Sequence, residues 1–176
     1  MDEKTANVTL KETDDQSRKV IRKAEITDIS RISEIYVFNN RQVYYPVFHN
    51  IKFSFAELQV LSFAKELERE RLQETFVYDD GIVKGFVTVH DHEIEKLHVE
   101  SFFRRSRIGS ALLRYALSHC SATFLWVLKK NENAIAFYKK NGFVFSSEEQ
   151  LLEGVNGHTE PIVKMVLKDG ETHYDL

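Results

Sequence analysis

Cysteine, proline, glycine and tryptophan are all scarce in this chain of 176 residues, which has one cysteine, two prolines, seven glycines and one tryptophan. The single cysteine, Cys120, excludes an internal disulfide framework and is typical of a reducing compartment. No linker rich in proline and glycine divides the chain, and it contains no internal repeat. We therefore expect one domain, because a chain of this length usually buries a single core.

Long apolar runs and a strong charge of either sign are also missing. No segment approaches the length of a membrane-spanning helix, and residues 1–18 contain only the short apolar stretch Val-Thr-Leu, which is too short for a signal peptide. The formal net charge of −3 is unlike the strongly basic field of a dedicated nucleic-acid binder. We expect a cytoplasmic protein with a polar leader over residues 1–18 and no membrane or nucleic-acid partner.

The apolar residues change their spacing along the chain, and this spacing predicts the elements. Ile29, Ile32 and Ile35 fall on one face of a helix that should end in the aromatic stretch 39–53, and residues 55–67 predict a second amphipathic helix. A strand over 19–26 precedes these helices, and a hairpin over 74–89 that turns at Asp80-Gly81 and a strand over 93–99 follow them. Then come a helix after 104–107, a strand over 123–130, a helix over 131–141, and two strands over 143–147 and 160–168 around a turn at Asn156-Gly157. This order predicts one α+β domain over 19–169, with a tail over 170–176.

Three short segments carry the most specific pattern. Residues 93–99 read EIEKLHV, the stretch from residue 104 reads RRSRIGSALL, and residues 131–143 read NENAIAFYKKNGF. In this order and spacing they resemble the fourth strand, the acyl-CoA loop (Q/R-x-x-G-x-G/A) and the N-x-x-A-x-x-F-Y-x-x-x-G-F segment of the GNAT superfamily of acyl-CoA-dependent N-acyltransferases. The resemblance implies a three-layer α/β/α fold around a mixed, mostly antiparallel sheet of about seven strands, with the fourth and fifth strands splayed apart. It also implies an N-acetyltransferase that uses acetyl-CoA as co-substrate and needs no metal.

The resemblance also assigns cofactor contacts. Pantetheine would pair with the main chain in the gap beside the fourth strand, where the amide of Leu97 would stabilise the oxyanion. The phosphates would bind at the loop and at the start of the next helix, where unpaired amides and arginine side chains favour anions. The residues concerned are Leu97, His98, Val99, Arg104, Arg105, Ser106, Arg107, Ile108, Gly109, Ser110 and Asn131. Arg107 stands where the family usually has its first glycine. Taken alone, the three arginines could equally be solvent-exposed surface residues that bind no ligand.

Phe137 and Tyr138 are neighbours on a short predicted helix, so they point in different directions. We expect Phe137 to pack into the core while Tyr138 directs its hydroxyl towards the leaving sulfur of coenzyme A. A phenol with a pKa of about 10 is protonated at neutral pH and suits a general acid. The alternative is a packing tyrosine with a structural hydrogen bond.

Direct acyl transfer needs a neutral amine, so a group must accept its proton, directly or through water. Glu93 and Glu95 should share one face of a strand and raise each other's pKa. Glu93 occupies the position of the general base in the histone-acetylating branch of the superfamily, and Glu95 is the second candidate. Solvated glutamates are the alternative reading of both.

The resemblance places the wall of the acceptor cleft between the first two helices, at Tyr44, Tyr45, Phe48 and Phe53, although these aromatics would also fit the core or a homodimer contact. A peptide N-terminus, a lysine, a polyamine or an amino sugar would each fit as acceptor. His90 and His92 share a strand face, but no further ligand completes a metal site. Two other functions stay open: a non-catalytic acyl-CoA-binding regulatory module, and a phosphate-binding interaction protein.

Overall fold

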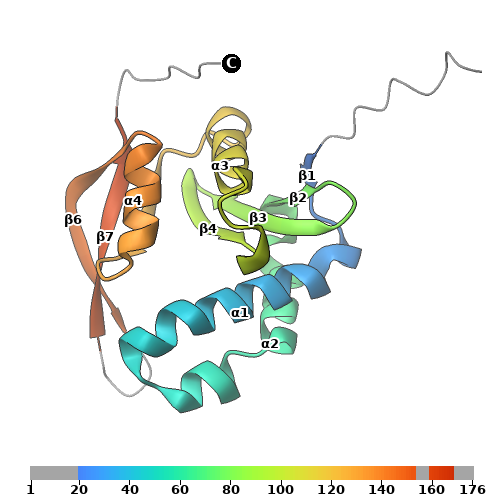
Figure 1. Cartoon of the computed structure of the whole chain (residues 1–176), viewed down its shortest axis with the longest axis horizontal. Helices are drawn as coiled ribbons and strands as arrows, with labels where there is room; N and C mark the ends of the chain where they lie inside the picture. Colours follow the sequence, from blue (N-terminus) through green and yellow to red (C-terminus); the bar gives the residue numbers. More distant parts are fainter. Residues whose placement is uncertain (1–19, 154–158, 169–176) are drawn as a thin grey trace, which may run out of the picture.

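The computed structural model describes residues 20–153 and 159–168 (Figure 1). The predicted leader over 1–18, the turn at Asn156-Gly157 and the tail over 170–176 lie outside these residues. The described residues form a seven-stranded sheet in the order β1-β2-β3-β4-β5-β7-β6. Its strands are β1 (Ile21–Lys23), β2 (Thr75–Asp79), β3 (Val83–His90), β4 (Glu93–Val99), β5 (Phe124–Leu128), β6 (Phe143–Glu153) and β7 (Thr159–Leu167).

All neighbouring strands are antiparallel except β4 and β5, which are parallel. The predicted α+β class and the mixed, mostly antiparallel sheet are therefore confirmed. The Asp80-Gly81 hairpin is also confirmed, because this turn joins the antiparallel strands β2 and β3. Gly81 has a φ of 121°, a backbone conformation that residues with a side chain rarely adopt.

Helices cover both faces of this sheet, which makes three layers (Figure 1). On one face a core cluster joins the sheet to α1 (Ile29–Phe48), α2 (Val60–Glu66) and the short helices between α2 and β2. On the other face a second cluster joins it to α3 (Ile108–His119) and α4 (Glu132–Lys140). The short helical turns are η1 (Ile26–Asp28), η2 (Phe53–Glu57), η3 (Leu67–Arg71), η4 (Leu72–Glu74) and η5 (Ser101–Phe103).

Two helix predictions are wrong in their limits. α1 continues to Phe48 with Pro46 inside it, because a proline so near the end of a helix removes a single backbone bond and leaves the earlier turns intact. The predicted helix over 55–67 is divided: η2 ends before Leu58, and α2 begins at Val60. The restart shifts the apolar stripe, so Leu61 is 76% exposed while Phe63 is buried.

Candidate active site

The sheet opens between β4 and β5, and this opening is the centre of the candidate site. The two strands pair at one position, Glu93 with Phe124, at the start of each strand. β5 then pairs along its length with β7, while β4 pairs along its length with β3. The predicted splay is confirmed, and the later part of β4 has an edge that β5 does not cover.

The backbone of Leu97 and Val99 faces this open edge. The Glu100 N–H donates to the Lys84 carbonyl oxygen at 2.9 Å, so the two residues form a hydrogen-bonded pair at the end of the β3–β4 ladder. Because such pairs alternate in an antiparallel ladder, the amide and carbonyl of Leu97 and Val99 point away from β3. The Val99 carbonyl accepts a hydrogen bond from Asn39 Nδ2 (3.0 Å), whereas the Leu97 amide is directed towards the gap.

α3 begins beside this edge with unpaired amides. Its first backbone bond runs from the Ala111 N–H to the Arg107 carbonyl (2.9 Å), so the N–H groups of Ile108, Gly109 and Ser110 have no backbone acceptor among the described residues. Arg107 itself has φ 65° and ψ 0°, the left-handed conformation that favours glycine. The loop thus keeps the backbone shape of a glycine at this position and adds a cationic side chain.

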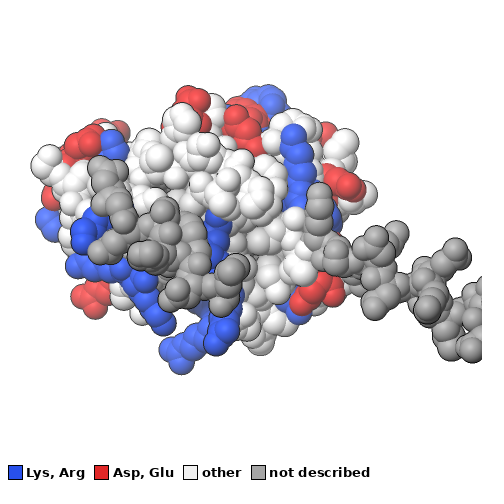
Figure 2. Space-filling view, turned by 90° about the horizontal axis from the view of Figure 1, so that it is seen from above, with Lys and Arg blue, Asp and Glu red and all other residues white. Residues whose placement is uncertain are grey.

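The arginines of the loop differ in their partners. Arg105 and Arg107 are exposed, and neither forms an ion pair or a hydrogen bond within residues 20–153 and 159–168. Arg104 is exposed too, but its Nη2 donates to Asn39 Oδ1 on α1 at 2.7 Å. Figure 2 shows the molecule from above the view of Figure 1, on the side of the C-terminal end of α3; Lys and Arg side chains gather in the lower left of that face with few acidic groups among them. Unpaired amides and unpaired guanidinium groups fit an anionic pyrophosphate.

The polar and small residues near α3 and α4 are held as follows. Asn131 caps α4, because its side chain accepts from the Ala134 N–H at 3.2 Å. The Ser106 hydroxyl donates to the Phe103 carbonyl, and Ser110 is half-buried. A Cβ added to Gly109 would lie 3.5 Å from the Phe137 ring, an ordinary contact, so the packing of α3 against α4 does not require a glycine here.

Tyr138 is more deeply buried than the sequence suggests. It is 9% exposed and packs edge-on against the rings of Phe137 and Phe143, while Phe137 is half-buried at the margin of the same cluster. Phe137 packs against the core as expected, but Tyr138 is the more buried of the two, so the expectation that Phe137 is the core residue of the pair is wrong. The Tyr138 hydroxyl makes no hydrogen bond to a described residue, and burial raises the pKa of Tyr138 above its usual value. A protonated, unpaired phenol at this position suits a proton donor.

Glu93 and Glu95 lie on the face of the sheet that α1 and α2 cover, because Ile94 between them points into the opposite core. Their charges behave differently. Burial raises the pKa of Glu93, and the charge of Glu95 raises it further. Burial acts in the same direction on Glu95, but hydrogen bonds from Arg71 (3.0 and 3.2 Å) and the charge of Lys96 outweigh it and lower the pKa of Glu95.

The expected mutual pKa rise of the two carboxylates thus holds for Glu93 and fails for Glu95. No sequence pattern reveals the Arg71–Glu95 pair, because the two residues lie on different elements. A bulge contributes to the arrangement, since Thr88 pairs with Lys96 and Val89 with Ile94, which leaves Glu95 as an extra residue in β4.

The His98 side chain lies away from the open edge. Its ring stacks on Phe86 (5.4 Å between centroids) and meets Tyr36 edge-on (5.3 Å), on the α1 side of the sheet. Burial lowers the pKa of His98 to about 3, which keeps the imidazole neutral. Its backbone belongs to the hydrogen-bonded pair with Phe86 and points towards β3, so neither the side chain nor the main chain of His98 faces the open edge.

Three of the four aromatics predicted to wall the acceptor cleft form one group. Tyr44 meets Phe48 edge-on at 5.9 Å and lies 6.3 Å from Phe53. Tyr45 instead contacts Phe55 at 5.4 Å. The same region contains buried hydrogen-bonding groups without a partner in the described part of the chain, Asn40 Nδ2 and Ser54 Oγ.

The two histidines considered as metal ligands have other partners. His90 Nδ1 lies 3.0 Å from the Glu74 carboxylate, and His92 Nδ1 lies 2.9 Å from the Ser121 carbonyl oxygen. Among the residues that the structure describes, no group of three or more His, Cys, Asp or Glu side chains could hold a metal ion.

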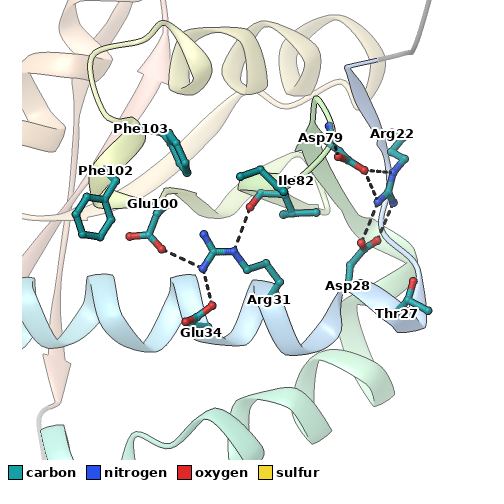
Figure 3. Close-up of a pocket in the computed structure, with 12 residues that line it drawn as sticks. Arg22, Thr27, Asp28, Arg31, Glu34, Asp79, Ile82, Glu100, Phe102 and Phe103 are labelled. Atoms are coloured by element: carbon teal, nitrogen blue, oxygen red, sulfur yellow. Dashed lines mark hydrogen bonds and ion pairs between the residues drawn. The ribbon is translucent and has the colours of Figure 1, made fainter. Parts of the chain in front are cut away.

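A separate hollow of about 690 Å³ lies between α1, the β2–β3 turn and η5 (Figure 3). Neither Tyr138 nor Glu93 lines it. Its charged groups bind one another: Arg22 bridges Asp28 and Asp79, and Arg31 pairs with Glu34 and Glu100. These pairs tie the start of α1 to the sheet and to η5.

Comparison with known proteins agrees with this geometry. Residues 33–143, more than half of the chain, match the model of the acetyltransferase (GNAT) family. Among solved structures, Ard1 from Thermoplasma volcanium is 26% identical with a TM-score of 0.56, covering 84% of this chain and 97% of that one. A ribosomal-protein-alanine N-acetyltransferase from Brucella melitensis is 18% identical with a TM-score of 0.62, covering 84% and 99%. The putative acetyltransferase yncA from Salmonella typhimurium, solved with acetyl-CoA, is 19% identical with a TM-score of 0.58, covering 88% and 96%.

No helix in the described part of the chain is long and apolar enough to cross a membrane. The match to the family model extends from α1 to the start of β6, so it includes the open edge of β4, the arginine loop and α4. The chain therefore belongs to the GNAT family of acetyltransferases, and the protein is an acyltransferase.

Proposed function

We propose that this protein transfers an acetyl group from acetyl-CoA to a primary amine by direct attack in a ternary complex. The observation that carries the proposal is the open edge of β4, which lies beside the unpaired amides at the start of α3. Arg105 and Arg107 add positive charge without a partner among the described residues, which favours the phosphates of coenzyme A. The thioester carbonyl would lie near the Leu97 amide, which would stabilise the oxyanion.

In this proposal Tyr138 is the general acid. As the amine nitrogen bonds to the carbonyl carbon and the carbon–sulfur bond breaks, the Tyr138 hydroxyl gives its proton to the departing sulfur. Burial supports this role only in that a raised pKa keeps the phenol protonated, so that its hydroxyl has a proton to donate as negative charge develops on the sulfur. The absence of a competing hydrogen bond within the described residues leaves the hydroxyl available.

Glu93 is the proposed general base, and it accepts the proton of the attacking amine directly or through water. Its raised pKa brings a carboxylate closer to the pH at which it has to work. Glu95 is less suited, since its ion pair with Arg71 stabilises the charged, weakly basic form. The acceptor would enter from the α1–α2 side, past the Tyr44, Phe48 and Phe53 group, where Asn40 and Ser54 offer unpaired polar atoms.

A thiol-release assay with acetyl-CoA across an amine library, including peptide N-termini, lysine, polyamines and amino sugars, tests the proposal. We expect Tyr138→Phe to lower turnover by about 10²- to 10⁴-fold, the usual range for a general acid. Its coenzyme A affinity and its stability should stay near those of the wild type, because the ring packing remains and no hydrogen bond to a described residue is lost. Tyr115→Phe is the matched control; Tyr115 stacks on His119 at the far end of α3 and should not affect the rate.

Two results would contradict the proposal. Coenzyme A binding without thiol release on any amine would favour the non-catalytic module over the enzyme. Equal turnover of the wild type and Tyr138→Phe would leave acetyl transfer in place and remove Tyr138 from its mechanism.

A further inference from the structure

A buried asparagine of α1 joins two parts of the candidate cofactor site. Asn39 is 4% exposed, and both ends of its amide are hydrogen-bonded. Its Nδ2 donates to the Val99 carbonyl at 3.0 Å, and its Oδ1 accepts from Arg104 Nη2 at 2.7 Å. Because donor and acceptor are both engaged, the amide has one preferred orientation, and each partner is fixed relative to α1.

The two partners lie at the ends of one short segment. Val99 is the last residue of β4, and Arg104 follows η5 and opens the arginine loop. Between them, the buried carboxylate of Glu100 lies 3.1 Å from Arg31 Nη1, so α1 also holds the middle of the segment (Figure 3). Arg31 is itself fixed by a bond from its Nε to the Val83 carbonyl (3.2 Å). The segment from Val99 to Arg104 is therefore attached to α1 at three points.

We propose that Asn39 is a positioning residue for the cofactor loop, an inference that rests on the proposed function. Its amide holds the Arg104 guanidinium and the end of β4 in place before the cofactor binds. One guanidinium nitrogen is engaged by Asn39, and the others stay available for a phosphate oxygen. Donors that are already fixed avoid the entropic cost of being ordered on binding, which raises affinity.

The same contact explains why Arg104 differs from its neighbours. Arg105 and Arg107 have no partner in the described part of the chain, so their side chains must be ordered by the ligand itself. Arg104 is already ordered by a group on another element. Losing Asn39 should therefore weaken cofactor binding without changing the chemistry at Tyr138 and Glu93.

Calorimetric titration with coenzyme A and steady-state kinetics with acetyl-CoA test this inference. We expect Asn39→Ala to raise the Kd for coenzyme A and the KM for acetyl-CoA by about five- to thirtyfold, with kcat changed less than about twofold. Asn39→Asp should be intermediate, since it keeps an acceptor for Arg104 and loses the donor to Val99. Ser33→Ala is the matched control: Ser33 is also a buried polar residue of α1, but its hydroxyl donates to the Ile29 carbonyl of the same helix (2.7 Å).

A double-mutant cycle with Arg104→Ala separates positioning from a general loss of stability. We expect Arg104→Ala to cost much less affinity in the Asn39→Ala background than in the wild type. Additive effects, or an Asn39→Ala protein with wild-type Kd and only a lower binding stoichiometry, would overturn the inference. If Asn39→Ala does not fold, the test uses Asn39→Asp instead, and a Kd for coenzyme A equal to that of the wild type would overturn the inference. A wild-type protein that binds no coenzyme A would instead refute the proposed function.

Discussion

Replacing Arg107 by glycine should stabilise the fold and weaken cofactor binding at the same time. Arg107 has φ 65° at the N-cap of α3, and it is exposed, so the substitution removes no packing. The left-handed conformation costs a residue with a Cβ about 1–2 kcal/mol, and glycine avoids this cost. Glycine also gives the unfolded chain more freedom, which offsets about 0.4–1 kcal/mol. We expect a net gain of about 0.5–1 kcal/mol, or roughly 1–4 °C in Tm for a domain of this size.

Arg107→Ala isolates the backbone effect, because it removes the same charge and keeps the Cβ. Urea and thermal unfolding should rank Arg107→Gly as more stable than Arg107→Ala, while both bind coenzyme A about three- to tenfold more weakly at low salt, with a smaller difference at high salt. Equal stability of the two variants would refute the backbone argument. Unchanged affinity in both would show that Arg107 is a solvated surface residue.

Two further predictions concern Glu93 and Gly85. Glu93→Gln should lower kcat/KM by about 10²-fold or more and abolish the loss of activity at acidic pH. In the wild type we expect that loss to begin above the usual titration range of a glutamate. The pKa of Glu93 is raised, so its carboxylate is protonated as the pH falls through that higher value. The dependence of kcat/KM on pH measures this effect. The same loss of activity at acidic pH in Glu93→Gln would show that another group is the general base. Gly85→Ala should destabilise the protein by about 1–3 kcal/mol, since a Cβ there would lie 2.7 Å from the His98 carbonyl oxygen. Gly109→Ala is the control in urea unfolding, because its Cβ would meet Phe137 at 3.5 Å, an ordinary contact, and equal losses would contradict the steric argument.

Most of the fold could be predicted from local pattern. The hairpin at Asp80-Gly81, the strand over 93–99 and the helices after the arginine loop and after Asn131 are confirmed, because turn residues and apolar periods determine them locally. The limits of α1 and α2 could not be predicted. Tertiary packing decides how far α1 continues past Pro46 and which face of α2 is buried, and this packing overrides the apolar period read from 55–67.

The candidate site divides in the same manner. Its motif residues and their order are visible in the chain, but the partners that set their chemistry come from distant segments. Arg71 lowers the pKa of Glu95 and leaves Glu93 as the better base, and Asn39 fixes Arg104; neither contact has a local signal. The depth of Tyr138 depends on the rings of Phe137 and Phe143, so its position relative to the core could not be read from helix geometry alone.

The sequence by itself determined the family, the order of the elements and the residue types along the open strand, the arginine loop and the helix of Tyr138. These are properties of neighbours in the chain, where side-chain period, caps and turns act over a few residues. Only the tertiary structure decided which carboxylate forms an ion pair and which arginine is bonded to α1. It also decided that Arg107 adopts the left-handed backbone conformation at the position of the usual glycine. Those outcomes depend on charges and hydrogen bonds between segments far apart in the chain, and their strength follows from burial and distance, which exist only once the chain is folded.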